Sequence, residues 1–149
     1  MKMMMTRRTI LLVAAALPAT LPGVLRAQTT GVAPMRLRCR FADQDFTYLL
    51  SDNATTRDLL TLLPSTLEIT DFSTNEKIAH LPRRLDEAGR TPITDETPGD
   101  LCYFRGWGSL AFFYGAYRYR DDLIRLGGIE GGLSPLMVKG AHPLQLDLI

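Results

Sequence analysis

Residues 98–114 read PGDLCYFRGWGSLAFFY, in which a Pro-Gly turn precedes two apolar runs that are rich in aromatic residues. Aromatic residues are enriched in β-strands, and the glycine on either side of the tryptophan favours a tight turn between the two runs. The stretch therefore predicts two strands, over residues 101–105 and 110–114, and we expect them to be the most buried strands of the protein.

Strict alternation of apolar and polar residues extends this β pattern toward the N-terminus. In MRLRCRF, residues 35–41, every second side chain is apolar and three arginines occupy the positions between them. A period of two predicts a half-buried strand. This strand is expected to form a hairpin with a second strand over residues 46–51. Residues 66–72 alternate again, and residues 77–81 form a shorter extended piece that ends before Pro82.

One helix is predicted between these strands. Asp52 or Asn53 can cap its N-terminus, because a short side-chain oxygen accepts a hydrogen bond from a free amide of the first turn. Pro64 ends it, since proline cannot continue a helix. The apolar face of the helix consists of Leu59, Leu60, Leu62 and Leu63.

The C-terminal part completes a mainly β pattern. Residues 83–98 are rich in charge, glycine and proline without any period, and they predict a long loop or two tight turns. Residues 123–129 are strand-like, but a glycine pair within them indicates a bulge or a barrel bend. One helical turn within residues 131–137 and an alternating strand over 144–148 follow. About eight strands with one main helix predict a closed antiparallel β-barrel, because closure removes exposed edges.

The first 27 residues have the features of a removable export signal. Arg7 and Arg8 directly precede an apolar run from Ile10 to Leu17, and no acidic residue occurs before Asp43. Paired arginines favour the twin-arginine route over an ordinary secretory signal. The apolar run is too short to remain as a membrane anchor, which needs about 20 residues. We predict a signal peptide over residues 1–27, a tether over 28–34, one domain over 35–149, and a periplasmic or secreted location without a stable membrane anchor after cleavage.

Charge and composition exclude a nucleic-acid partner for the mature domain. The chain has 17 Lys and Arg against 16 Asp and Glu, and removal of residues 1–27 leaves 13 basic and 16 acidic residues, a formal net charge of −3. A phosphate-binding surface needs clustered basic residues instead. A domain of this size buries roughly two-thirds of its surface on folding. Because no metal-ligand spacing occurs in it, we predict neither a metal nor a cofactor.

A distinctive order of motifs runs through the body of the chain. It comprises a Leu-rich helix that begins after Asn53 and ends in Leu63-Pro64, then Asp71-Phe72, Glu76-Lys77, and residues 98–103, 107–114 and 126–129. With this order, residues 35–149 resemble the bacterial cyclophilin-like domain family, most specifically over residues 99–114. The resemblance implies a compact antiparallel barrel and carries no established catalytic residues. Active cyclophilins place an arginine close to Phe and His, whereas Phe104-Arg105 has no histidine near it in sequence.

Arg105, Trp107 and Tyr114 are the candidate ligand-binding residues. An arginine beside an indole would bind a carboxylate or a peptide carbonyl. The aromatic run that continues to Tyr119 would line a groove for an extended peptide or a small hydrophobic molecule. The alternative places Trp107 at the end of the barrel, Arg105 in solvent and residues 112–113 in the core.

The sequence contains two other groups of reactive residues. Glu76 and His80 would serve as acid and base, but no third group completes a site, and we interpret Glu76-Lys77 as a salt-bridged strand end. Cys39 and Cys102, the only cysteines, would be able to pair in an oxidising compartment. The place of Cys39 on the apolar face favours a free, buried thiol over a disulfide.

These observations predict an exported, non-catalytic barrel that binds a short peptide or a small organic molecule near Arg105, Trp107 and Tyr114. Two alternatives stay open. One is a weak peptidyl-prolyl isomerase in which Arg105 donates to the amide nitrogen. The other is an interaction domain that uses its acidic surface.

Overall fold

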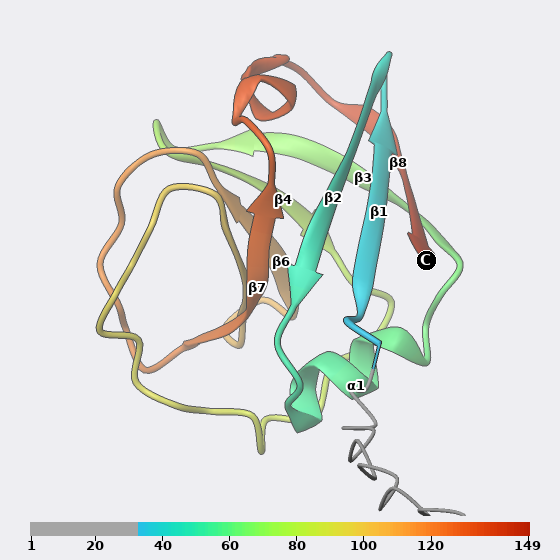
Figure 1. Ribbon diagram of the computed structural model, residues 1–149. Helices are drawn as coiled ribbons and strands as arrows, with labels where there is room; N and C mark the ends of the chain where they lie inside the picture. Colours follow the sequence, from blue (N-terminus) through green and yellow to red (C-terminus); the bar gives the residue numbers. More distant parts are fainter. Residues whose placement is uncertain (1–32) are drawn as a thin grey trace, which may run out of the picture. The chain divides into compact units, whose positions relative to one another are not determined.

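The computed structural model describes residues 33–149 (Figure 1). The predicted signal peptide over residues 1–27 and most of the predicted tether lie outside these residues. The described part contains β1 (Arg36–Phe41), β2 (Gln44–Leu50), α1 (Ala54–Leu60), β3 (Ser65–Phe72), β4 (Glu76–His80), β5 (Asp100–Phe104), β6 (Ser109–Phe113), β7 (Leu123–Glu130), the 3-10 helix η1 (Ser134–Met137) and β8 (His142–Leu148).

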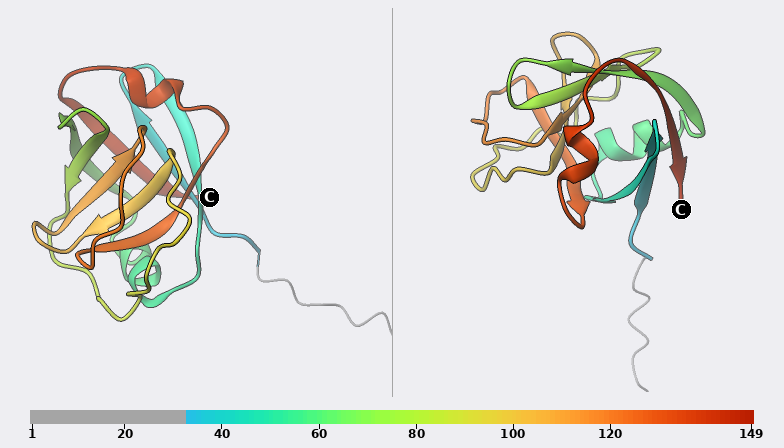
Figure 2. Two further views of the ribbon diagram at one scale, coloured as in Figure 1. Left: turned by 90° about the vertical axis from the view of Figure 1, so that its left-hand side faces the viewer. Right: turned by 90° about the horizontal axis from the view of Figure 1, so that it is seen from above.

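The eight strands close into one antiparallel barrel in the order β1-β2-β7-β5-β6-β4-β3-β8, and β8 pairs with β1 to complete it (Figure 2). Each strand of the described region therefore has a hydrogen-bonded neighbour on both sides, which removes the exposed edge of an open sheet. The prediction of a mainly β fold, a closed antiparallel barrel of about eight strands with one main helix, is confirmed.

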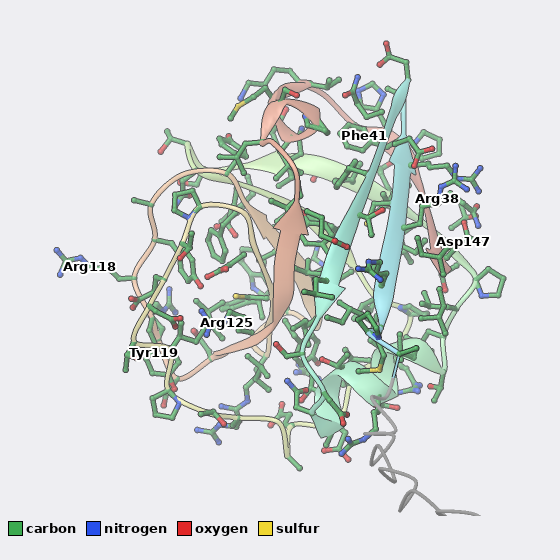
Figure 3. All side chains as sticks on the ribbon, in the orientation of Figure 1. Arg38, Phe41, Arg118, Tyr119, Arg125 and Asp147 are labelled. Carbon is green, nitrogen blue, oxygen red and sulfur yellow. The ribbon has the colours of Figure 1, made fainter. Side chains whose placement is uncertain are left out.

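Alternation along β1 separates the barrel interior from solvent, as predicted. Leu37, Cys39 and Phe41 are at most 2% exposed and belong to the main core. The three arginines between them face outward and pair with acidic side chains of β7, β2 and β8: Arg36 with Glu130, Arg38 with Asp45, and Arg40 with Asp147. Figure 3 shows Arg38 and Asp147 together on this outer face. Exposed pairs of this kind each contribute about 0–1 kcal/mol to stability. The main effect of the three ion pairs is therefore to neutralise charge, and they stabilise the fold only slightly.

The central strands β5 and β6 are the most buried, as the sequence indicated. Their inward side chains join the main core. Their outward side chains pack in a second apolar cluster that consists of Ile93, Cys102, Ala111, Phe113 and Leu123. Two segments border this outer face, residues 81–99 and residues 114–122, drawn in yellow and orange in Figure 1. They meet where the Tyr119 amide donates to Glu96 Oε1 at 2.9 Å.

Two short helices lie at opposite ends of the barrel (Figure 1). Asn53 is the cap of α1, because its Oδ1 accepts a hydrogen bond from the Thr56 amide at 2.8 Å. Leu59 of α1 and Leu136 of η1 are fully buried in the main core. Within residues 33–149, neither these nor any other helix has the length and apolar character needed to cross a membrane.

A β-bulge accompanies the glycine pair of β7. The register of β5 against β7 shifts between Leu101 and Cys102, which leaves Leu126 without a partner residue on β5. A Cβ atom at Gly127 would stand 2.2 Å from the carbonyl oxygen of Leu49, so only glycine permits this approach of β2 and β7. The bulge that the sequence predicted is confirmed.

Alternation along β4 decides which of its residues reach the outer face. Lys77 points inward and is fully buried, with its ammonium 2.6 Å from Asp71 Oδ1 and 5.6 Å from the centroid of the Phe41 ring. Because successive side chains of a strand point to opposite faces, Glu76 and Ile78 lie on the outside of the barrel.

Candidate ligand-binding cleft

A cleft of about 500 Å³ lies on the outer face of the barrel, bordered by the segment 114–122. The left view of Figure 2 faces this side of the molecule. Outward side chains of β4, β5 and β6 form its floor, and the ends of β3 and β7 contribute to its walls. The apolar lining residues are Phe72, Ile78, Phe104, Trp107, Ala111, Phe113, Tyr117 and Leu123. Clefts of this volume with mainly apolar walls are typical of sites for small organic molecules.

Aromatic side chains shape the cleft. The Tyr117 ring stacks on Phe113 with 3.9 Å between ring centroids and 7° between the ring planes. Trp107 meets Phe72 and Phe104 edge to face, at 5.1 Å and 5.3 Å. The indole is nevertheless 52% exposed, so it forms part of the rim and leaves a large apolar surface open to solvent.

The segment 114–122 is anchored over the sheet by a hydrogen bond from Tyr117. Its hydroxyl donates to Asp100 Oδ2 at 2.7 Å, and the same oxygen accepts from the Thr97 amide at 3.0 Å. Burial and the bond to Asp100 raise the pKa of the Tyr117 phenol, which therefore stays a donor at neutral pH. This anchor positions one wall of the cleft without a ligand.

Glu76 is an acidic side chain of the cleft that has no partner. Within residues 33–149, no hydrogen bond or ion pair reaches its carboxylate, which lies half-buried against the apolar walls. Burial raises the pKa of Glu76 from 4.5 to about 7, and the positive charge of Arg120 offsets only part of this shift. Near neutral pH the group is therefore present both as acid and as carboxylate.

Within residues 33–149, two other polar atoms of the lining lack a hydrogen-bond partner. Ser109 Oγ and Asp122 Oδ1 are buried, and neither has a partner among the described residues. The second oxygen of Asp122 accepts from Arg120 Nη2 at 2.5 Å. Buried polar atoms are nearly always hydrogen-bonded in native proteins, so these two atoms are an exception within a mainly apolar lining.

Comparison with known proteins identifies the family of the chain and a solved structure with a similar fold. The model of a family described as cyclophilin-like matches residues 39–146. The chain belongs to the cyclophilin-like family. A solved structure, that of a hypothetical protein from Archaeoglobus fulgidus, is similar with a TM-score of 0.62 and 17% sequence identity, over 76% of this chain and 94% of that chain. At this identity the likeness concerns the fold alone. No curated protein matches the sequence.

Of the three predicted binding residues of this cyclophilin-like domain, the structure brings only Trp107 to the cleft. Arg105 directly follows Phe104, whose ring lines the cleft, and Arg105 itself does not. Its guanidinium bonds to Glu87 Oε2 at 2.8 Å and to the carbonyl oxygen of Asp121 at 3.1 Å. These bonds hold Arg105 beside the cleft, engaged with its own chain.

Tyr114 also lies outside the cleft lining. Its neighbour Phe113 faces the cleft, whereas the Tyr114 ring packs against the main core with the Lys139 ammonium 5.3 Å from its centroid. Adjacent residues of an extended chain face opposite ways. Tyr117, from the same aromatic run, is the tyrosine that the structure places at the site.

The sequence interpretation of Glu76-Lys77 as a salt-bridged strand end is wrong for Glu76. Lys77 has an ion pair, but its buried ammonium pairs with Asp71 of β3, which is partly exposed. Alternation along β4 predicts the position of Glu76, because an inward Lys77 places Glu76 beside Ile78 on the cleft side. His80 is exposed and does not join the lining, although its ring lies 6.4 Å from that of Trp107.

Both cysteines are free and buried. Cys39 on β1 and Cys102 on β5 are separated by β2 and β7 in the barrel order, so the disulfide alternative is not realised. Burial raises the pKa of both thiols, that of Cys102 to about 12. In the described part of the chain, no three potential metal-ligating side chains come together.

Proposed function

We propose that this cyclophilin-like domain binds a small organic molecule in the outer-face cleft. The observation that carries the proposal is a cleft of about 500 Å³ whose apolar walls contain polar groups without partners, Glu76 and Ser109. Binding sites combine these two properties, since apolar walls supply affinity and a few polar groups orient the ligand.

The anchored walls support binding of a ligand without a large rearrangement. Tyr117 is bonded to Asp100 and stacked on Phe113, so the segment above the cleft is already ordered. Association then loses less conformational entropy than it would if the ligand had to order that segment.

A small molecule suits the barrel better than a peptide that adds as a strand. Strand addition requires an unpaired sheet edge. In the closed barrel of residues 33–149 each strand has neighbours on both sides. A ligand must therefore be held by the side chains of the cleft.

A thermal-shift screen of the full chain with small aromatic and aliphatic compounds tests this function. A compound at 100 times its Kd should stabilise the fold by about 2.7 kcal/mol. Trp107→Ala, which removes part of the rim, should weaken binding of every hit. Met137→Ala is the matched control, because Met137 is also exposed, at 48%, but lies on η1 outside the cleft. If no compound binds, or if the two variants bind every hit equally, the cleft is not the site.

We propose in addition that the domain acts outside the cytoplasm, exported by its N-terminal segment. Arg7 and Arg8 before a short apolar run support this location. Replacement of both by lysine should retain a C-terminally tagged full chain in the cytoplasm of a bacterium that has the twin-arginine translocase. Replacement of Arg83 and Arg84 by lysine, an adjacent pair in the folded domain, should leave export unchanged. Export that is independent of the translocase argues against this route.

A further inference from the structure

We propose that the ligand of the cleft is an organic cation, a primary ammonium on an aromatic or aliphatic body, and that Glu76 binds its charged nitrogen. This inference rests on the proposed function and names the class of molecule that the cleft takes.

The first argument is that Glu76 lacks a donor where neighbouring acids have one. Glu76 lies opposite Phe113 in the pairing of β4 with β6, and its side chain reaches the cleft. Asp71 on β3 has Lys77, Asp122 has Arg120, and Asp100 on β5 has the Tyr117 hydroxyl. A half-buried carboxylate without such a partner is costly. A ligand that brings N–H donors and positive charge relieves that cost.

The second argument is that no cation within residues 33–149 forms an ion pair with Glu76. Lys77, the next residue, points to the interior of the barrel. Arg120 bonds to Asp122 and lies 5.9 Å from the centroid of the Phe104 ring. Arg118 belongs to the exposed rim of the cleft, where its side chain extends outward (Figure 3), and it forms no ion pair with Glu76. From β5, the buried Cys102 thiol is the nearby titratable group, and burial keeps it neutral.

The third argument concerns the sign of charge inside the cleft. The charged lining residues are Glu76, Asp122, Arg118 and Arg120. Arg120 pairs with Asp122, and the exposed Arg118 lies at the rim, so Glu76 is the charge inside the cleft that no ion pair compensates. An anionic ligand would meet the Glu76 carboxylate in a partly dehydrated site, where like charges repel most strongly. A cation has favourable contacts with Glu76 and with the faces of aromatic rings such as Phe113 and Trp107.

The titration of Glu76 adds a measurable consequence. An alkylammonium keeps its proton from pH 6 to pH 8, whereas Glu76, with its pKa of about 7, changes from mostly acid to mostly carboxylate. The cation binds the carboxylate form, and the apparent Kd scales inversely with the fraction of that form. We therefore expect affinity for the cation to rise about tenfold between pH 6 and pH 8.

Calorimetric titration of the full chain with three probes that share one phenyl body tests the inference. The probes are 2-phenylethylamine, a cation; 2-phenylethanol, which is neutral; and 3-phenylpropanoate, an anion. At pH 8 the amine should bind at least tenfold more tightly than the alcohol, and the anion most weakly. Glu76→Gln should remove the advantage of the amine and its pH dependence while binding of the alcohol is unchanged. Glu68→Gln, at an exposed acid of β3, is the matched control.

The outcomes separate the two proposals. If amine and alcohol bind equally to the wild-type protein, or if the amine binds Glu76→Gln as well as wild type, the cation inference is wrong while a ligand-binding cleft stands. Tightest binding of the anion also overturns it. If none of the three probes binds, both proposals fail for ligands built on a phenyl group. Glu76→Asp, which keeps the charge but shortens the side chain, should bind the amine more tightly than Glu76→Gln does, and equal binding contradicts a charge-based role.

Discussion

Replacement of Glu76 by glutamine should stabilise the protein at alkaline pH and leave it unchanged in acid. The pKa of Glu76 rises from 4.5 in the unfolded chain to about 7 in the fold, because burial disfavours the carboxylate. A group with a raised folded-state pKa contributes its full stability below its unfolded pKa, and that contribution is lost as the pH rises through the folded pKa. The loss therefore falls between about pH 4.5 and pH 7.

The magnitude follows from the size of the shift. Each unit of pKa corresponds to about 1.4 kcal/mol, so a rise from 4.5 to about 7 sets an upper limit of roughly 3.4 kcal/mol. Glu76 retains contact with solvent through the open cleft, which screens the penalty. We therefore expect Glu76→Gln to raise the free energy of unfolding by about 1–2 kcal/mol at pH 8 and by about zero at pH 4.

Urea unfolding of the full chain at pH 4, 6 and 8, in wild type and Glu76→Gln, measures this difference. Glu68→Gln, at an exposed side chain of β3, is the matched control. A difference between wild type and Glu76→Gln that is the same at all three pH values refutes the buried, unpartnered carboxylate. A variant less stable than wild type at pH 8 refutes it more strongly, since it means that the carboxylate has an attractive partner in the fold.

Three further predictions follow from contacts elsewhere in the molecule. Asp71→Ala should lower the free energy of unfolding by about 3–5 kcal/mol, because it leaves the Lys77 ammonium buried without a counterion. Urea unfolding should show that the double variant with Lys77→Met regains part of this free energy. If it regains none, the ion pair is not the cause. Gly127→Ala should lower the melting temperature sharply, because the added Cβ would stand 2.2 Å from the carbonyl oxygen of Leu49 on β2. Gly132→Ala, which has open space around it, should leave the melting temperature unchanged. Similar melting temperatures for the two variants would contradict the close approach of β2 and β7. In a proline cis/trans assay on a short peptide, the full chain should give no acceleration that depends on Arg105, because that guanidinium is bonded to Glu87; a rate that disappears in Arg105→Ala would restore the isomerase hypothesis.

The face of a strand that a residue occupies decides whether it lines the cleft. Trp107 lines the cleft, but Arg105 and Tyr114, close to it in sequence, do not. The period of two that places Phe113 toward the cleft directs Tyr114 away from it. Proximity along the chain groups these three residues, whereas a site on a barrel combines residues of one face from several strands.

The amino-acid sequence by itself predicted the strands, a helix cap at Asp52 or Asn53, a bulge or bend at the glycine pair of β7 and the closed barrel. These features follow from local patterns, since alternation, capping and glycine conformations act over a few residues. Only the tertiary structure decided that β4, β6 and the segment 114–122 enclose a cleft with Glu76 inside it. That enclosure depends on contacts between distant segments, such as Tyr117 with Asp100, and no local pattern shows which outer face a loop will cover. The pKa of Glu76 is likewise a property of its surroundings, because burial by residues far away in sequence sets it.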